Sequence, residues 1–195
     1  MKQKKLSEIA DIHSGLVLSR KEASVDAEHE YKYRQLNLRS ISEDGNIDDE
    51  MLDDYISNEM IKEVFITREN DIIMRLFPPI HPIFIPASYS DLVIPSQFAI
   101  MRVKTKDILP EFLYLHLSRK EVLNEIYSKE GGHTVRSVKI STLYEVMTPV
   151  LPLEKQKELV GFSEVHNTRR KLHFELLHQY DAHANAVIKR IIEGD

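Results

Sequence analysis

The chain has 195 residues, of which 42% are hydrophobic, and this is enough to bury one substantial core. It contains no cysteine, which excludes a disulfide framework, cysteine-ligated zinc and thiol catalysis. The formal net charge of −5 argues against a general polyanion binder. We therefore expect an ordinary cytoplasmic protein, with no signal peptide or membrane span at its basic start.

Much of the negative charge falls in one segment. Seven acidic residues lie between positions 43 and 54, and without them the basic residues slightly outnumber the acidic ones. We expect this run to be a solvated loop rather than an acid–base pair. A neutral or basic face then remains elsewhere for contact with phosphate.

Residues 1–150 are predicted to form one mixed α/β (α+β) domain, because short apolar runs alternate with turn-forming residues. Five prolines between the last two expected strands predict an exposed connection. A helix is expected over 111–127, after Pro110, and Ser141 is expected to cap a later short segment. The expected strands are 31–36, 63–66, 71–76 and 97–103.

Residues 151–195 differ in character, because 153–192 contain no proline and a single glycine and favour one long helix. Forty residues span about 60 Å, which is too long to bury on a domain with a radius of gyration of about 15 Å. An apolar stripe with spacings of three and four, interrupted at Arg169, predicts pairing with a second helix. The stripe consists of Val165, Leu172, Leu176, Tyr180, Ala184, Val187 and Ile191.

Four segments together resemble one half of a specificity subunit of type I restriction-modification systems. In such a half, one target-recognition domain precedes one long helix. The sequence departs from the family at Asn70, where a glycine is common, and at Leu151–Pro152, where two prolines are usual. The segments are 6–15 (LSEIADIHSG), 70–75 (NDIIMR), 93–102 (VIPSQFAIMR) with 112–115 (FLYL), and 132–156, which ends in TPVLPLEKQ.

The resemblance implies a non-catalytic chain that gives a restriction-modification complex its DNA specificity. The implied partners are double-stranded DNA, methyltransferase subunits that bind S-adenosylmethionine, and a nucleotide-driven restriction subunit. The cofactors would belong to those partners, so this chain is expected to bind none. A typical subunit has two recognition domains and two helices. Two copies of this chain are therefore expected to pair as a homodimer through antiparallel helices and to read inverted half-sites.

Recognition of DNA needs cations that contact phosphate and side chains that read base edges. Candidates occur in the loop after Gly15, within an apolar strand, after Pro95, and in the alternating segment 133–139. The same side chains could instead be a solvated surface pair, a strand-edge arginine and a loop hydrogen bond. Tyr31 and Tyr33 are assigned to the core. The predicted contacts are Arg20, Lys21, Arg75, Ser96, Gln97, His133, Thr134, Arg136 and Lys139.

Other classes of function fit the sequence less well. The histidines of the long helix are spaced by seven, five and five residues, whereas ligands on one helix face need three or four, so no metal site is expected. A hydrolase or transferase lacks support, since there is no nucleophile elbow, phosphate-binding glycine loop or dinucleotide fingerprint. A protein-interaction module of the same fold without DNA binding stays open, and the acidic balance favours it. Only DNA binding would weaken steeply with salt.

Overall fold

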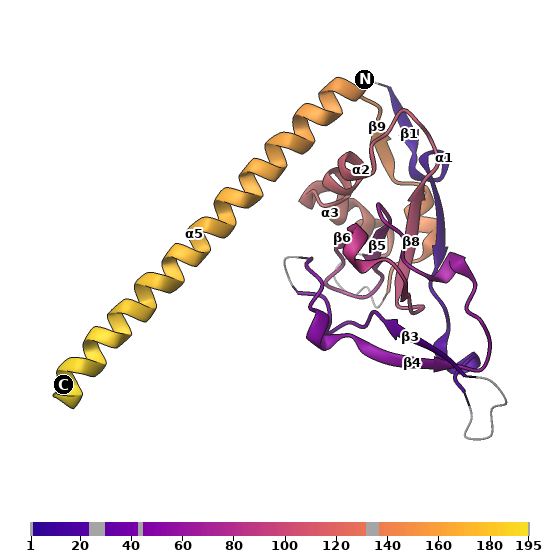
Figure 1. Cartoon of the computed structure of the whole chain (residues 1–195). Coiled ribbons are helices and arrows are strands. Elements are labelled where there is room, and N and C mark those ends of the chain that lie inside the picture. The colour runs from indigo at the N-terminus through magenta and orange to yellow at the C-terminus, as the bar shows by residue number, and fades with distance from the viewer. Residues whose placement is uncertain (1, 24–29, 43–44, 132–136, 195) are drawn as a thin grey trace. The chain divides into compact units, whose positions relative to one another are not determined.

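A computed structural model of the chain describes residues 2–23, 30–42, 45–131 and 137–194 (Figure 1). The chain divides into two compact units, Met1–Gln156 and Lys157–Asp195, which we call the N-terminal unit and the helical unit. The N-terminal unit contains small sheets and short helices, and the helical unit is the continuation of a single long helix. This arrangement confirms the predicted α+β fold with a long C-terminal helix.

A four-stranded antiparallel sheet forms the centre of the N-terminal unit, in the order β2-β8-β5-β6. Phe98, Ala99, Ile100 and Met101 of β8 are fully buried, and this strand is hydrogen-bonded to neighbours on both edges. β6 begins with Pro82 and lies at the sheet edge, where a missing backbone N–H is tolerated. The four strands are β2 (Ala10–Ser14), β5 (Ile72–Arg75), β6 (Pro82–Phe84) and β8 (Phe98–Val103).

Two smaller sheets lie at opposite ends of the N-terminal unit (Figure 1). At one end β1 (Gln3–Lys5) pairs with β9 (Met147–Pro149). At the other end is a three-stranded sheet in the order β4-β3-β7. Its strands are β3 (Tyr31–Gln35), β4 (Asp53–Ser57) and β7 (Leu92–Val93).

The acidic run is only partly a loop, contrary to the expectation. It contains the 3-10 turn η2 (Asp49–Met51) and the start of β4. Arg34 pairs with Asp49, and Arg39 pairs with Asp53. Two of the predicted solvated charges are therefore neutralised by arginines next to them in the fold.

Short helices and turns connect the sheets, and three sequence predictions fail here. The helix expected over 111–127 is two helices, because Arg119 between them is extended. The Ser118 hydroxyl also bonds to the Tyr114 carbonyl, a pattern that bends helices. Ser141 lies inside α4, whose N-cap is Lys139, and the expected strand 63–66 is a 3-10 turn. The elements are α1 (Leu6–Ile9), α2 (Pro110–Leu117), α3 (Lys120–Lys129), α4 (Ile140–Tyr144), η1 (Leu18–Arg20), η3 (Glu63–Phe65) and η4 (Ala87–Tyr89).

The connection between β5 and β8 was expected to be exposed, and this is correct mainly for its turns 77–79 and 86–88. It contains β6 and β7, and Ile83 and Ile85 are fully buried. Both side chains belong to the main core cluster, together with Ile73, Phe98 and Ile100. Pro82 starts β6 and is buried, so a proline does not by itself keep this segment on the surface.

The long helix α5 (Leu153–Glu193) has 41 residues and agrees with the predicted range 153–192. The large apolar side chains of the predicted stripe are between 42% and 76% exposed, and Ala184 is also exposed. No helix among the described residues is long and apolar enough to cross a membrane.

Candidate nucleic-acid interface

The order of the central sheet brings several predicted contacts to one end. β2 finishes at Ser14 and β5 at Arg75, and their partners Ala99 and Phe98 begin β8. The connections that follow or precede these residues therefore meet at the same end of the sheet. We call it the loop end, and it comprises Gly15–Lys21, Arg75–His81, Pro95–Gln97 and Ser137–Lys139.

Leu76 joins three segments of the loop end that are far apart in sequence. Its backbone N–H donates to the Gln97 carbonyl at 2.9 Å, and its own carbonyl accepts from the Val138 N–H at 2.7 Å. Gln97 takes part in the first bond itself, and Arg75 and Lys139 are the neighbours of Leu76 and Val138 in the chain. The fold thus gathers three of the predicted contacts around one backbone junction.

Gly15 lies where the loop Gly15–Lys21 packs against the loop Pro95–Gln97. The Gly15 N–H donates to the Phe98 carbonyl at 2.9 Å, and the Ser96 N–H donates to the Leu16 carbonyl at 2.7 Å. A Cβ atom on Gly15 would lie 2.2 Å from the Pro95 oxygen, a distance that no side chain can adopt. Only glycine therefore lets these two backbones pack so closely.

A shallow groove of about 360 Å³ runs between these two loops and the end of β3. Leu16, Leu36 and Pro95 are buried beneath it, while the Gln97 side chain is exposed at its margin. Sequence reasoning missed further polar residues of its lining: Ser19 in η1, Gln35 at the end of β3, Asn37 after it, and Asp53 at the start of β4. A second hollow, of about 420 Å³ beside Lys32 and Arg34, contains none of the predicted contacts.

The cations of the loop end differ in how far they are already paired. Lys21 forms an ion pair with Glu59, so it is less available to phosphate than its neighbour. Arg20 is exposed and pairs with no described residue. Arg75 is half-buried, with Nη2 only 3.5 Å from the Pro78 carbonyl.

The fourth described cation, Lys139, is 77% exposed and lies 3.9 Å from Glu130. The pKa of the Glu130 carboxyl is lowered, first by a hydrogen bond from the Thr142 hydroxyl. This carboxylate also accepts a hydrogen bond from the Lys139 backbone N–H, and so it fixes the main chain at this position. The ammonium group of Lys139 is largely solvated. Arg20, Arg75 and Lys139 are therefore the described cations best placed to contact phosphate.

Some predictions fall outside these contacts. His133, Thr134 and Arg136 lie outside the described residues. The core assignment holds for Tyr33, which is half-buried and accepts a hydrogen bond from the Ile61 N–H at 3.0 Å. It is wrong for Tyr31, which is 38% exposed at the start of β3.

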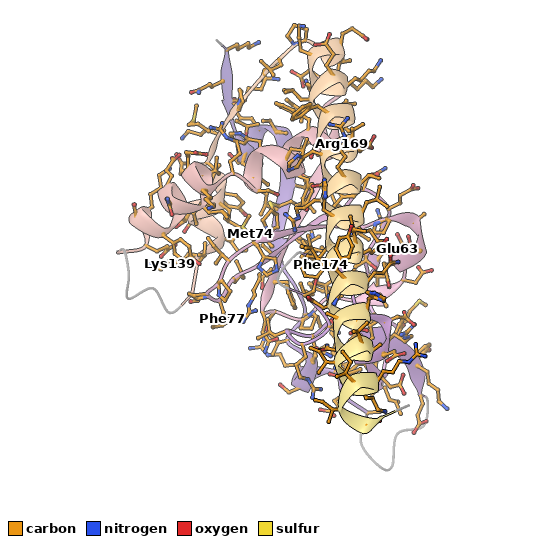
Figure 2. All side chains as sticks on the ribbon, turned by 90° about the vertical axis from the view of Figure 1, so that its left-hand side faces the viewer. Glu63, Met74, Phe77, Lys139, Arg169 and Phe174 are labelled. Carbon is orange, nitrogen blue, oxygen red and sulfur yellow. The ribbon has the colours of Figure 1, made fainter. Side chains whose placement is uncertain are left out.

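Sequence reasoning missed Phe77 and His81, which occupy the turn between β5 and β6. Figure 2 shows Phe77 beyond Met74 and on the same side of the N-terminal unit as Lys139. Burial lowers the pKa of His81, and its Nε2 has no hydrogen-bond partner among the described residues. The sequence contained a signal for the turn, because the two prolines after Phe77 cannot continue a central strand.

A metal centre is not found in the part of the chain that the structure describes, where no three His, Asp or Glu side chains converge. Two histidines of α5 instead lie beside phenylalanines one turn away. His166 stacks on Phe162, and His178 meets Phe174 edge-on.

Comparisons with known proteins identify the fold. No family model matches the sequence, and neither does any curated protein. Among solved structures, a chain from a type I R-M system studied for complex assembly and conformational transition has a TM-score of 0.67. It is 16% identical, over 88% of this chain and 43% of that one.

Two further structures are S subunits. The HsdS subunit from Thermoanaerobacter tengcongensis has a TM-score of 0.63 at 18% identity, over 87% of this chain and 43% of that one. The type I S subunit from M. genitalium has a TM-score of 0.51 at 12% identity, over 86% of this chain and 39% of that one. This chain therefore has the fold of a type I specificity subunit over less than half of that subunit's length.

Proposed function

We propose that this chain is a non-catalytic DNA-specificity component of a type I restriction-modification complex and reads one half-site through its loop end. The observation that carries the proposal is the convergence of Arg75, Gln97 and Lys139 at one end of a fold shared with type I S subunits, with Arg20 in the loop that follows β2 at the same end. The three cations supply phosphate contacts, and the Gln97 amide can pair with an adenine edge. Methyltransferase subunits and a restriction subunit are the proposed partners, and any nucleotide or S-adenosylmethionine is bound by them.

The test uses the full chain, alone and mixed with its methyltransferase subunit, and a fluorescent duplex library of random sequence. Binding should fall steeply between 50 and 200 mM salt, and each lost phosphate contact should reduce the logarithmic salt slope by about one. The variants Arg75→Ala and Lys139→Ala should each do so, whereas Gln97→Ala should leave the slope unchanged and relax the selected sequence. Salt-independent binding, or an unselective pool, would refute the proposal.

We also propose that α5 pairs with the α5 helix of a second copy. The stripe from Val165 to Ile191 supports this, because exposed apolar surface of this extent is characteristic of interfaces. A second set of large apolar side chains, between 54% and 78% exposed, widens the surface: Phe162, Phe174, Leu177, Ile188 and Ile192. Two antiparallel helices would hold two recognition units at a fixed separation.

Sedimentation equilibrium of the full chain at micromolar concentration tests the pairing. The wild type should have the mass of a dimer, and the charge introduced by Leu172→Asp or Leu176→Asp should convert it to a monomer. Ala182→Asp adds the same charge on the face of α5 opposite the stripe and away from the second apolar set, and it should leave the dimer intact. A monomeric wild type would remove the homodimer but not the DNA-reading proposal.

The alternative function, a protein-interaction module of the same fold, predicts a different result. Such a chain would co-purify with a partner through α5 but would not bind duplex even at low salt. The net charge of −5 is the observation that favours it.

A further inference from the structure

Phe77 is an aromatic side chain at the surface of the loop end. It follows β5 directly and is 40% exposed. The next two residues, Pro78 and Pro79, are also exposed and have fixed φ angles. The ring is therefore carried by a stiff turn at the edge of the proposed DNA-contacting surface.

The base of this turn is rigidly held. Leu76, immediately before Phe77, is 7% exposed and bonds on one side to Gln97 and on the other to Val138. On the far side of the turn, the Arg75 N–H donates to the His81 carbonyl at 3.3 Å. A ring presented from such a support loses little conformational entropy when it meets a ligand.

The polar groups around Phe77 favour a nucleic acid over an apolar partner. The turn 77–81 has no acidic residue, and Arg75 lies against it through the Pro78 carbonyl. The Nε atom of Arg75 is buried and has no hydrogen-bond partner among the described residues. Gln97 accepts one backbone bond of Leu76, and Lys139 follows Val138, which donates the other. An exposed aromatic ring bordered by cations is the arrangement that proteins use to stack on nucleobases next to phosphates.

We propose that Phe77 stacks on a nucleobase of the bound DNA, and that Arg75 contacts the adjacent phosphate. The proposal rests on the DNA-reading function above. Phenylalanine has no hydrogen-bonding group, so it does not read a base edge. Stacking by Phe77 favours DNA base steps that unstack easily, such as pyrimidine–purine steps. The ring therefore contributes to target choice through the deformability of the DNA.

The absence of tryptophan from the chain allows a direct test. The variant Phe77→Trp carries the sole indole, and base stacking should quench its fluorescence when duplex from the selected pool is added. The matched control is Met147→Trp. Met147 is 37% exposed and lies on β9, at the end of the N-terminal unit away from β3 and β4 (Figure 1). The control should bind the same DNA without quenching.

Affinity provides a second readout. Phe77→Ala should weaken binding about tenfold with an unchanged salt slope, because the ring carries no charge. Phe77→Leu keeps the apolar packing but loses the ring face, so it should weaken binding similarly while melting at the wild-type temperature. Met147→Ala should bind like the wild type.

The outcomes separate this inference from the function on which it rests. A wild-type chain that binds no duplex, alone or with its methyltransferase, overturns both. Wild-type binding with an unquenched Phe77→Trp and unaltered Phe77→Ala and Phe77→Leu affinities overturns the stacking alone. Loss of methyltransferase co-purification in Phe77→Ala, with DNA affinity intact, assigns the ring to a protein contact and also overturns it.

Discussion

The side-chain oxygen of Gln156 accepts a hydrogen bond from the backbone N–H of Leu109 at 2.8 Å. The same amide donates to the carbonyls of Asp107 and Leu151 at 2.7 and 2.8 Å. Gln156 is fully buried although it belongs to the first turn of α5. One side chain therefore satisfies three backbone groups where the chain passes from the recognition fold into its long helix.

Replacing Gln156 should destabilise the N-terminal unit. Gln156→Ala leaves three backbone groups without this partner, at a cost of about 1–3 kcal/mol for each group that water does not reach. Gln97→Ala is the matched control, because Gln97 is exposed, and it should leave stability unchanged within about 0.5 kcal/mol. Urea unfolding followed by circular dichroism compares the two, and equal midpoints would contradict the assigned role.

Two glycine-to-alanine substitutions should have opposite signs. Gly15→Ala places a methyl group against the Pro95 carbonyl and must separate the two loops, so it should lower both stability and DNA affinity. Gly161 lies within α5 with nothing near its missing Cβ. Gly161→Ala should therefore stabilise the helix by about 0.5–1 kcal/mol. Thermal unfolding followed by circular dichroism at a helix-sensitive wavelength measures the stability of both variants. An unchanged stability of Gly15→Ala would show that the close packing at Pro95 is dispensable.

Asp71 and Arg102 form the most buried ion pair described. Nε and Nη2 of Arg102 donate to the two carboxylate oxygens at 2.9 and 3.0 Å, and the side chains are 3% and 17% exposed. Asp71→Asn should cost about 3–5 kcal/mol, because it leaves a buried guanidinium uncompensated. The exposed pair Asp11–Lys104 provides the control, and Asp11→Asn should cost less than about 1 kcal/mol. Denaturant unfolding with similar losses for both variants would contradict this difference.

The sequence predicted the features that follow from periodicity and from ordered motifs. The long helix, β3, β5 and β8 lie where alternation or three-four spacing placed them. The departure at Asn70 also has a physical basis, because this residue adopts φ 68°, which asparagine tolerates far better than most residues. A glycine at this position in related proteins would serve the same backbone turn.

What the sequence could not predict depends on tertiary contacts. Nothing local indicates that Lys21 pairs with Glu59, or that Leu76 bonds to both Gln97 and Val138. The break at Arg119 is likewise unmarked by proline or glycine. The prolines after Phe77 indicate that the strand ends there, but the exposure of the ring depends on the tertiary fold and not on the local sequence.

Acid should destabilise the fold through His116. This residue is 7% exposed on α2, and its Nε2 lies 3.0 Å from the Met147 carbonyl, which can only accept, so Nε2 carries the proton of the neutral ring. Burial lowers the folded-state pKa of His116 below the ordinary 6.5. As pH falls through 6.5 the unfolded chain binds a proton before the folded chain does. The stability present above pH 6.5 is therefore lost progressively down to the folded-state pKa, by at most about 1.4 kcal/mol per pH unit.

The variant His116→Gln can still donate to the Met147 carbonyl but cannot titrate. Its unfolding free energy, measured in urea from about pH 7 to about pH 5.5, should depend less on pH than that of the wild type. The pKa of His81 is also lowered by burial, so part of the slope should persist until His81→Gln is added. If the double variant retains the full wild-type slope, the two buried imidazoles are not its source, and protonation of other groups must drive the loss of stability.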